Sequence, residues 1–265
     1  SILSGDINIL VDGVLVGQRL GDGGLAAINL SVPVYQVLCI LGSFLVSGTA
    51  ICASREIGRE NVERTRDLCK QAQTLCLIAS VAATALGFIF LQPLASFLCS
   101  DESIRPMVRD YIAVTIAGSL PNILLYIPFW FLRLEGKNRS ITVMMVIMGG
   151  GNIILDLWFL YGLDWGVFGA SLASVLSTAA ACVFGLIRLF GTGSSFVLGI
   201  SVPRSRKEWG EISAAGSPSA LNNLFQTFRL LIVNSVFLQY GGASMVAAFT
   251  AVNGILAFSE CVTGG

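Results

Sequence analysis

The stretch INLSVPVYQVLCILGSFLVSGTAICA, residues Ile28–Ala53, decides the structural class of this protein. It contains no charged side chain, and roughly 20 apolar residues are enough for a helix to cross the hydrocarbon core of a bilayer. The stretch is too long for a membrane strand and lacks the alternation of apolar and polar residues that such a strand shows. It therefore predicts a transmembrane helix.

Further apolar windows of similar length follow the same pattern along the chain. Their expected bounds are Ser1–Val16, Ala72–Leu98, Tyr111–Leu132, Ser140–Tyr161, Val167–Leu189, Ile212–Leu238 and a last window from Met245 onward. The chain of 265 residues is 54% hydrophobic and only 12% charged, whereas a soluble domain carries about 25% charged residues. We therefore expect an all-α, polytopic membrane protein surrounded by membrane lipid.

The charge balance and the residue types argue against several other classes of protein. The formal net charge is +0, so nothing indicates nucleic acid as a partner. The chain has no His, and its seven Cys form no CxxC pair, so we expect small core residues rather than metal ligands or disulfides. Without a visible nucleophile, base or metal cluster, we expect neither an enzyme nor a cofactor.

The basic residues indicate how the helices are oriented. Twelve of the sixteen Lys and Arg residues fall near the loops after the second, fourth and sixth windows: Arg55, Arg59, Arg64, Arg66, Lys70, Arg133, Lys137, Arg139, Arg188, Arg204, Arg206 and Lys207. The opposite loops hold only Arg19, Arg105 and Arg109. Because cytoplasmic loops carry the excess of Lys and Arg, we expect these three loops to be cytoplasmic and the first helix to run outward through the plasma (inner) membrane.

The longest polar connection divides the chain into three parts. We expect a six-helix lobe over residues 1–190, with its first helix truncated, and a cytoplasmic linker over residues 191–211. Residues 212–265 would then begin a second lobe with a seventh helix and part of an eighth. Because Ser1 and the last residues both lie within apolar runs, we expect the chain to be the N-terminal part of a longer protein.

The sequence also repeats itself on either side of the linker. VDGVLVGQRLGDGGLAAINL from Val11 resembles VNSVFLQYGGASMVAAFTAV from Val233. Val11–Asp12 align with Val233–Asn234, and after a one-residue gap Leu25–Ala27 align with Val246–Ala248. Since six helices separate the two copies, both have the same orientation in the membrane. Parallel repeats of this kind are a transporter architecture.

Two acids within the membrane windows indicate a functional site. Asp12 and Asp156 both lie roughly 8–9 Å below the outer boundary, at 1.5 Å per residue, and Asn8 and Asn152 each precede one of them by four residues. Ser174 falls at a similar depth. Carboxylate, amide and hydroxyl oxygens suit a hard cation, and two adjacent acids in a low dielectric must hold Na⁺ or a proton. Alternatively, either acid caps a broken helix or faces water.

Two further charges lie within the expected helices of the second lobe. Arg229 could neutralise one of the acids across a helix interface. Glu260 could face a cavity and attract cationic substrates, or it could lie at a cytoplasmic boundary. Both are therefore accessory candidates, together with Asn8.

Taken in order, several segments resemble the multidrug and toxic compound extrusion (MATE) family. They are NILVDGVLVGQRLGDGGLAAINLSVPV, ASREIGRENVERTRDL, FLRLEGKNRS, GNIILDLWFLYGLDWGVFGASLASVLS and GSPSALNNLFQ. The resemblance spans the whole chain. It implies twelve helices in two six-helix lobes around a central cavity, in a monomer that exports organic cations and other drugs in exchange for Na⁺ or H⁺.

The resemblance also implies a set of site residues. In one branch of the family, the first-lobe cation site uses an Asp on helix one, an Asn and an Asp one turn apart on helix five, and a Thr on helix six. The matching residues are Asp12, Asn152, Asp156 and, with Ser in place of Thr, Ser174. The alternative is a lipid-linked oligosaccharide or polysaccharide flippase of the same superfamily. Such flippases often carry basic residues in the cavity, whereas this first lobe carries acids.

Overall fold

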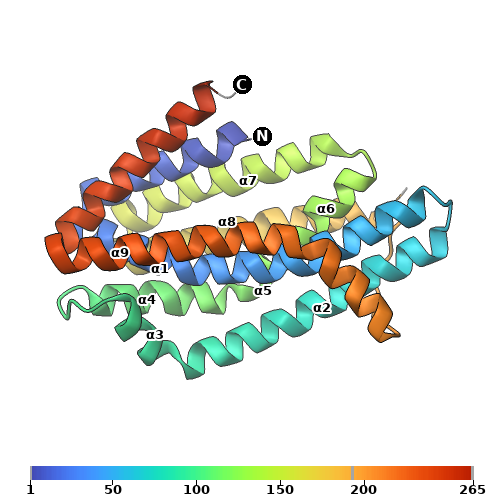
Figure 1. Ribbon diagram of the computed structural model, residues 1–265. Coiled ribbons are helices and arrows are strands. Elements are labelled where there is room, and N and C mark those ends of the chain that lie inside the picture. The colour runs from blue at the N-terminus through green and yellow to red at the C-terminus, as the bar shows by residue number, and fades with distance from the viewer. Residues whose placement is uncertain (1, 192–193, 264–265) are drawn as a thin grey trace.

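Long helices lie side by side along a common axis in the computed structural model (Figure 1). The structure describes the backbone of residues 2–191 and 194–263, and the side chains of residues 15–191, 194–249 and 252. Within these residues the regular structure is helical, with no strand. The expected all-α fold is therefore confirmed.

The elements, in chain order, are α1 (Ile2–Ile57), α2 (Val62–Ile89), α3 (Leu91–Leu98), α4 (Arg105–Ala117), α5 (Ser119–Leu124), α6 (Tyr126–Leu134), α7 (Asn138–Asp156), the π-helix η1 (Leu157–Gly162), α8 (Gly166–Phe190) and α9 (Arg206–Thr263). Five helices in the described part are long and apolar enough to cross a membrane. The pair Arg105–Ala117 and Ser119–Leu134, bent by 57°, makes a sixth if it is counted as one span.

The turns between the helices gather at the two ends of the bundle. Residues 58–61, 135–137 and 194–205 lie at one end, which we call the basic end because the Lys- and Arg-rich segments of the sequence surround these turns. The chain turns at Gly21, at residues 99–104, at residues 163–165 and at Gly242 at the other end, which we call the opposite end. This alternation is the one that the loop charges predict.

Three prolines explain where the structure departs from the expected helix bounds. Pro has no N–H with which to bond the carbonyl four residues earlier. Accordingly α2 ends at Ile89, four residues before Pro93. In the same way α4 ends at Ala117, before Pro121, and α5 ends at Leu124, before Pro128. The windows expected as the single helices Ala72–Leu98 and Tyr111–Leu132 are therefore broken, and α2 begins ten residues earlier than expected, at Val62.

Two other prolines lie inside continuous helices, where side chains bond the carbonyls that they release. Pro33 of α1 cannot donate to Asn29, and the Asn234 side chain of α9 donates to the Asn29 carbonyl oxygen at 3.2 Å. Pro218 of α9 cannot donate to Ala214, whose carbonyl oxygen accepts the Ser217 hydroxyl at 3.0 Å. In both cases the helix continues past the proline, and a side chain replaces the missing main-chain donor.

The repeat in the sequence has a counterpart in the backbone. Gly21 (φ 64°, ψ −166°) and Gly242 (φ 63°, ψ −162°) are the non-helical residues inside α1 and α9. They precede the aligned residues Leu25 and Val246 by the same four positions. A positive φ of this size favours Gly. Each repeat therefore folds back on itself at an equivalent glycine, which supports the one-residue gap in the alignment.

The helices α1 and α9 make the most extensive helix contact of the described chain. Each has a first leg before its bent glycine and a second leg after it, and Gly48 lies on the second leg of α1. A Cβ atom on Gly48 would lie 2.3 Å from the Ile212 carbonyl oxygen, and one on Gly216 would lie 2.3 Å from the Phe44 carbonyl oxygen. Such distances are too short for any real Cβ atom. The crossing of the two helices near the basic end is therefore a backbone-to-backbone contact that requires both glycines.

The Asn234–Asn29 hydrogen bond can be tested through its dependence on Pro33. In the Pro33→Ala variant, the substituted residue can donate its own N–H to the Asn29 carbonyl, which then depends less on the Asn234 amide. We expect Asn234→Val to be more destabilising in the wild-type background than in the Pro33→Ala background, by about 1 kcal/mol. Thermal unfolding in detergent of the two single variants and the double variant measures this coupling. Additive effects would contradict it.

Candidate cation site

The site predicted on the fifth membrane window lies on the last turns of α7. Asn152 and Asp156 are one turn apart, so they share a face of the helix. Asn152 is 3% exposed and Asp156 is 0% exposed. Burial of a carboxylate is costly unless its charge is compensated. This acid therefore does not face water in the described structure.

Ser174 of α8 lies beside the α7 residues, as the sequence predicted. The Asn152 side-chain amide donates to the Ser174 hydroxyl at 3.2 Å. A second serine one turn on, Ser177, donates instead to the main-chain carbonyl of Ser174 within its own helix, at 3.0 Å. Ser174 is thus the hydroxyl of α8 that joins the two helices at this level.

The structure describes the other four predicted residues to different extents. Asp12 and Asn8 lie on the helical backbone of α1 and Glu260 on that of α9, but their side chains are outside the described residues. Arg229 lies on α9 and is exposed. The described structure therefore brings Asn152, Asp156 and Ser174 to one place, and the cation-binding role of all seven residues stays a prediction.

A small apolar cluster lies one turn from the site on three helices. It consists of Val16 of α1, Leu160 of η1 and Ala170 of α8, which are 1%, 0% and 4% exposed. Leu160 follows Asp156 by four residues, and Ala170 precedes Ser174 by four on a helix that runs the other way. The cluster therefore lies between the site and the opposite end of the bundle.

The π-helix that follows Asp156 is fixed in part by α1. A π-helix bonds residues five apart, and such turns often occur at functional sites. Arg19 donates through Nε to the Leu160 carbonyl oxygen at 3.3 Å and through Nη2 to the Asp164 carboxylate at 2.8 Å. In return, the Tyr161 hydroxyl donates to the Leu15 carbonyl oxygen at 3.2 Å. Arg19, expected in a loop, thus clamps α1 to the segment just beyond Asp156.

The oxygens at the site suit a hard monovalent cation or a proton. Asp156 supplies a carboxylate, Asn152 an amide oxygen and Ser174 a hydroxyl. Within the described side chains, no group of three or more His, Cys, Asp and Glu residues could hold a metal ion. The available donor set therefore matches Na⁺ or H⁺ better than a transition metal, which prefers His and Cys.

Comparison with known proteins assigns the chain to a family. Residues 9–158 match the family model described as MatE. The chain belongs to the MatE family. The resemblance stated from the sequence is thereby confirmed, and this MATE chain, with its apolar spans, is a multi-pass membrane protein.

The individual relatives extend beyond the chain. It is 28% identical over 247 residues to a FAD transporter of Shewanella oneidensis, covering 91% of this chain and 54% of that protein. It is 24% identical over 266 residues to the multidrug export protein MepA of Staphylococcus aureus, covering 100% of this chain and 58% of that protein. The MATE chain thus spans somewhat more than half the length of these two relatives.

A solved structure supports the same architecture. It is titled as the inward-facing conformation of a multidrug resistance MATE family transporter of the MOP superfamily. The TM-score is 0.84 at 28% identity, and the match covers 97% of this chain and 60% of that one. The helices described above therefore form the MATE fold over the length of chain that they share.

Sequence reasoning missed a polar group next to the site of this MATE chain. The Thr115 and Ser171 hydroxyls lie 3.2 Å apart between α4 and α8, and each also donates to the Tyr111 carbonyl oxygen at 3.0 Å. Ser171 precedes Ser174 by three residues on α8 and is 1% exposed. The spacing of Ser171, Ser174 and Thr178 at three and four residues was the signal that could have found it, because such residues share a helix face.

The clamp can be divided into its charged and main-chain parts by two substitutions. Asp164→Asn removes only the ion pair, whose side chains are 41% and 71% exposed, so we expect it to cost less than about 0.5 kcal/mol. Arg19→Met also removes the donor to the Leu160 carbonyl, so we expect a loss of about 1 kcal/mol or more. Thermal unfolding at low and high salt measures both effects. Equal losses that disappear in high salt would show that the ion pair alone matters.

Proposed function

We propose that this chain supplies the first lobe and the start of the second lobe of a secondary active antiporter, which exports drugs or organic cations in exchange for Na⁺ or H⁺. The observation that carries the proposal is the buried Asp156 beside the Asn152–Ser174 hydrogen bond, in a chain of the MatE family. A fully buried acid among neutral oxygens is the arrangement that ion coupling requires, because its charge state must change with the bound cation.

We further propose that Asp12 belongs to the same site. Val16 lies in the apolar cluster with Leu160 and Ala170, and it follows Asp12 by four residues on the helical backbone of α1. Residues four apart share a helix face. Asp12, Asp156 and Ser174 therefore each lie one turn from a member of the cluster. Together these three residues could surround one cation.

The coupling step follows from this geometry. With the site between the apolar cluster and the bundle interior, an empty pair of acids would be unfavourable because of their mutual repulsion. A cation or protons entering from outside would reduce the negative charge of the pair and favour closer packing of the first leg of α1 against α7 and α8. Exchange then requires that ion and drug favour different conformations, each through its own difference in affinity.

The identity of the substrate is also part of this proposal. The named relatives include a multidrug exporter and a FAD transporter, so family membership by itself does not choose between cationic drugs and an anionic dinucleotide. The acids of the first lobe favour organic cations. They give less support to the flippase alternative, in which basic residues would be expected to bind the phosphates of a lipid-linked sugar.

The proposed sidedness can be tested with introduced cysteines, because the native thiols are poor probes. Cys69 and Cys99 are both 0% exposed, and burial raises the pKa of the Cys99 thiol. We expect a membrane-impermeant maleimide to label Glu102→Cys, whose native side chain is 87% exposed at the opposite end, in intact cells. Glu63→Cys, exposed at the basic end, should be labelled only after the membrane is opened. The reverse labelling pattern would contradict the proposed orientation.

The coupling role of Asp156 can be tested in proteoliposomes containing the two-lobe protein. We expect Asp156→Asn to abolish uptake of a fluorescent organic cation driven by an imposed Na⁺ or H⁺ gradient, while expression and insertion stay close to wild type, since loss of an intramembrane charge lowers the insertion cost. Asp12→Asn should behave alike. The double variant should be little worse than either single one, because the two acids act as a unit.

Two matched variants serve as controls for this experiment. Asp110→Asn removes an exposed acid of α4 at the opposite end and should retain coupled transport. Ser177→Ala removes a buried hydroxyl that bonds only within α8, whereas Ser174→Ala removes the hydroxyl that contacts Asn152 and should weaken the apparent ion affinity. Full ion-driven transport by Asp156→Asn would refute the proposed site.

A further inference from the structure

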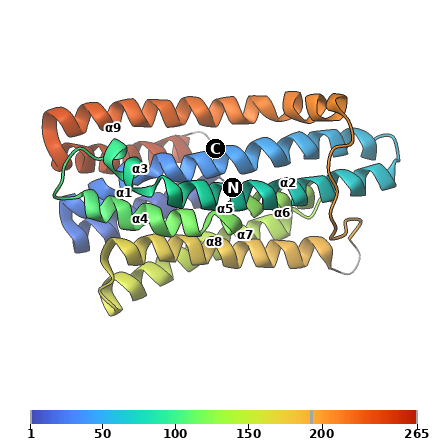
Figure 2. The same cartoon turned by 90° about the horizontal axis from the view of Figure 1, so that it is seen from below.

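The connection between α8 and α9 packs against the side of α2 and is hydrogen-bonded to it. This segment, residues 194–205, which we call the strap, crosses α2 on its way to α9 (Figure 2). Gln73 of α2 donates to the Val197 carbonyl at 3.1 Å and accepts the Gly199 N–H at 3.2 Å. Thr74 accepts the Ser201 N–H at 3.0 Å. Alternate main-chain groups of the strap are thus bonded to α2 side chains.

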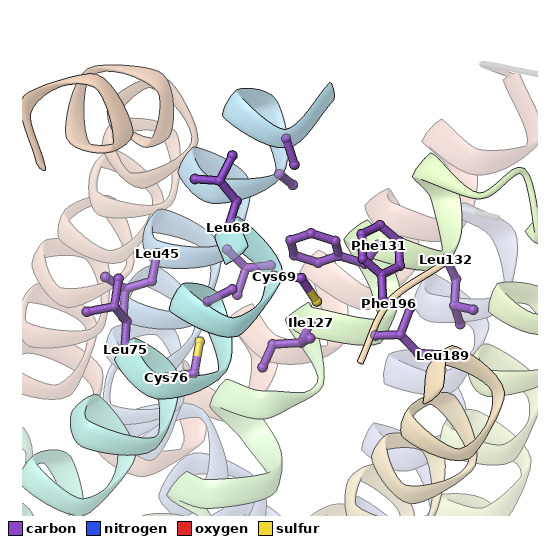
Figure 3. Packing of buried hydrophobic residues seen from close by; sticks show 14 of the residues in the cluster. Leu45, Leu68, Cys69, Leu75, Cys76, Ile127, Phe131, Leu132, Leu189 and Phe196 are labelled. Carbon is purple, nitrogen blue, oxygen red and sulfur yellow. The ribbon is translucent and has the colours of Figure 1, made fainter. Parts of the chain in front are cut away.

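The start of the strap is anchored by a charge and by an aromatic contact. Glu135 accepts both the Ser194 hydroxyl and the Ser195 N–H at 2.8 Å. Phe196 is 3% exposed and meets Phe131 edge-on, with ring centroids 5.0 Å apart, in the cluster at the basic end (Figure 3). The strap therefore has a fixed inner face.

The outer face of the strap is apolar and uncovered in the described chain. Leu198, Ile200 and Val202 are 71%, 87% and 54% exposed, and we call them the apolar face of the strap. They alternate with Gly199 and Ser201, which contact α2, as expected for an extended segment. Three aliphatic side chains held outward by a fixed backbone would be unfavourable in water. The strap therefore presents a surface that suits an apolar neighbour.

The position of the strap along α2 places it at a membrane boundary. Apart from Val62 at its first residue, the exposed aliphatic side chains of α2 begin at Leu77 and continue with Ile78 and Val81, which is where a multi-pass protein meets lipid. Leu77 lies three residues beyond Thr74, or roughly 5 Å along the helix. Trp209, in the first turn of α9 and 40% exposed, directly follows Glu208, which accepts a hydrogen bond from Gln71 of α2 at 2.6 Å, and Trp is enriched at membrane–water interfaces.

A basic segment follows the apolar face at once. Arg204, Arg206 and Lys207 are all exposed, and the Arg204 side chain remains 78% exposed although its nearest carboxylate, that of Asp67, is 3.8 Å away. Basic residues beside an apolar surface attract anionic lipid headgroups. Apolar depth and positive charge therefore occur together at one place on the molecule.

We propose that the strap is a lipid-binding element at the basic end. Its apolar face inserts at the boundary between headgroups and acyl chains, and the basic segment binds the headgroups of anionic phospholipid. This inference goes beyond the proposed antiporter function and does not require it, since it depends only on the multi-pass membrane location. It also assigns a binding partner to a segment that the sequence presents simply as a linker.

Site-specific photocrosslinking in native membranes tests the proposal in the whole protein. A benzophenone amino acid at Ile200 should yield phospholipid adducts, detected by mass spectrometry. The same probe at Ile78, 58% exposed on the lipid-facing part of α2, is the positive control, and at Val62, 53% exposed at the tip of the α1–α2 turn, it is the negative control. We expect the adducts at Ile200 to be enriched at least twofold in anionic over zwitterionic lipid relative to those at Ile78.

The basic segment has its own measurement. Replacing Arg204, Arg206 and Lys207 by Gln should remove the anionic enrichment at Ile200 while leaving adduct formation itself. Adducts at Ile78 but none at Ile200 would overturn the proposal, and crosslinks from Ile200 to protein would show that a second lobe or a second copy covers the strap. Because the readout is a lipid adduct, loss of transport through failure of the antiporter proposal would not affect it.

Discussion

The structure depends throughout on one constraint, the need to satisfy every main-chain carbonyl in a medium that offers no water. Three prolines end helices four residues earlier, and two others lie within helices that continue because a side chain bonds the released carbonyl. The same device recurs outside proline: Arg19 bonds the Leu160 carbonyl beside the π-helix, and Gln73 bonds the strap. At each of these places a polar side chain donates to a main-chain carbonyl oxygen.

Asp156 differs from the other buried polar groups because it is a fully buried acid. Most buried hydroxyls of the described chain bond carbonyls of their own helix, as Thr49 and Ser31 do. Asn152 and Ser174 instead bond one another across two helices, and an acid lies one turn away. The polarity at that point therefore exceeds what helix packing needs, which is why it supports a functional interpretation when the remaining polar contacts do not.

Much of the fold followed from the sequence because hydrophobic length and loop charge are local properties. The spans near Ser140–Tyr161 and Val167–Leu189 were placed within a few residues, and Asn152 and Ser174 were placed beside one another. Prolines were expected to bend helices, but which of them end one was not predicted, because whether Pro33 or Pro121 does so depends on a partner such as Asn234 from a distant segment. The start of α9 at Arg206 could have been predicted from the sequence. Ser205 caps the helix by accepting the Glu208 N–H, and a Ser followed three residues later by Glu is a local signal of a helix start.

The glycine crossing of α1 and α9 also sets a mechanical ratio. Gly48 lies 27 residues from the bend at Gly21 and nine from the end of α1 at Ile57, so its arms are roughly 40 Å and 14 Å at 1.5 Å per residue. Gly216 divides the first leg of α9 in nearly the same proportion, between Arg206 and Gly242. A rotation about this contact would displace the two ends in opposite directions, and the far end would travel about three times as far as the near one. The crossing thus has the geometry of a fulcrum close to one end of a long lever.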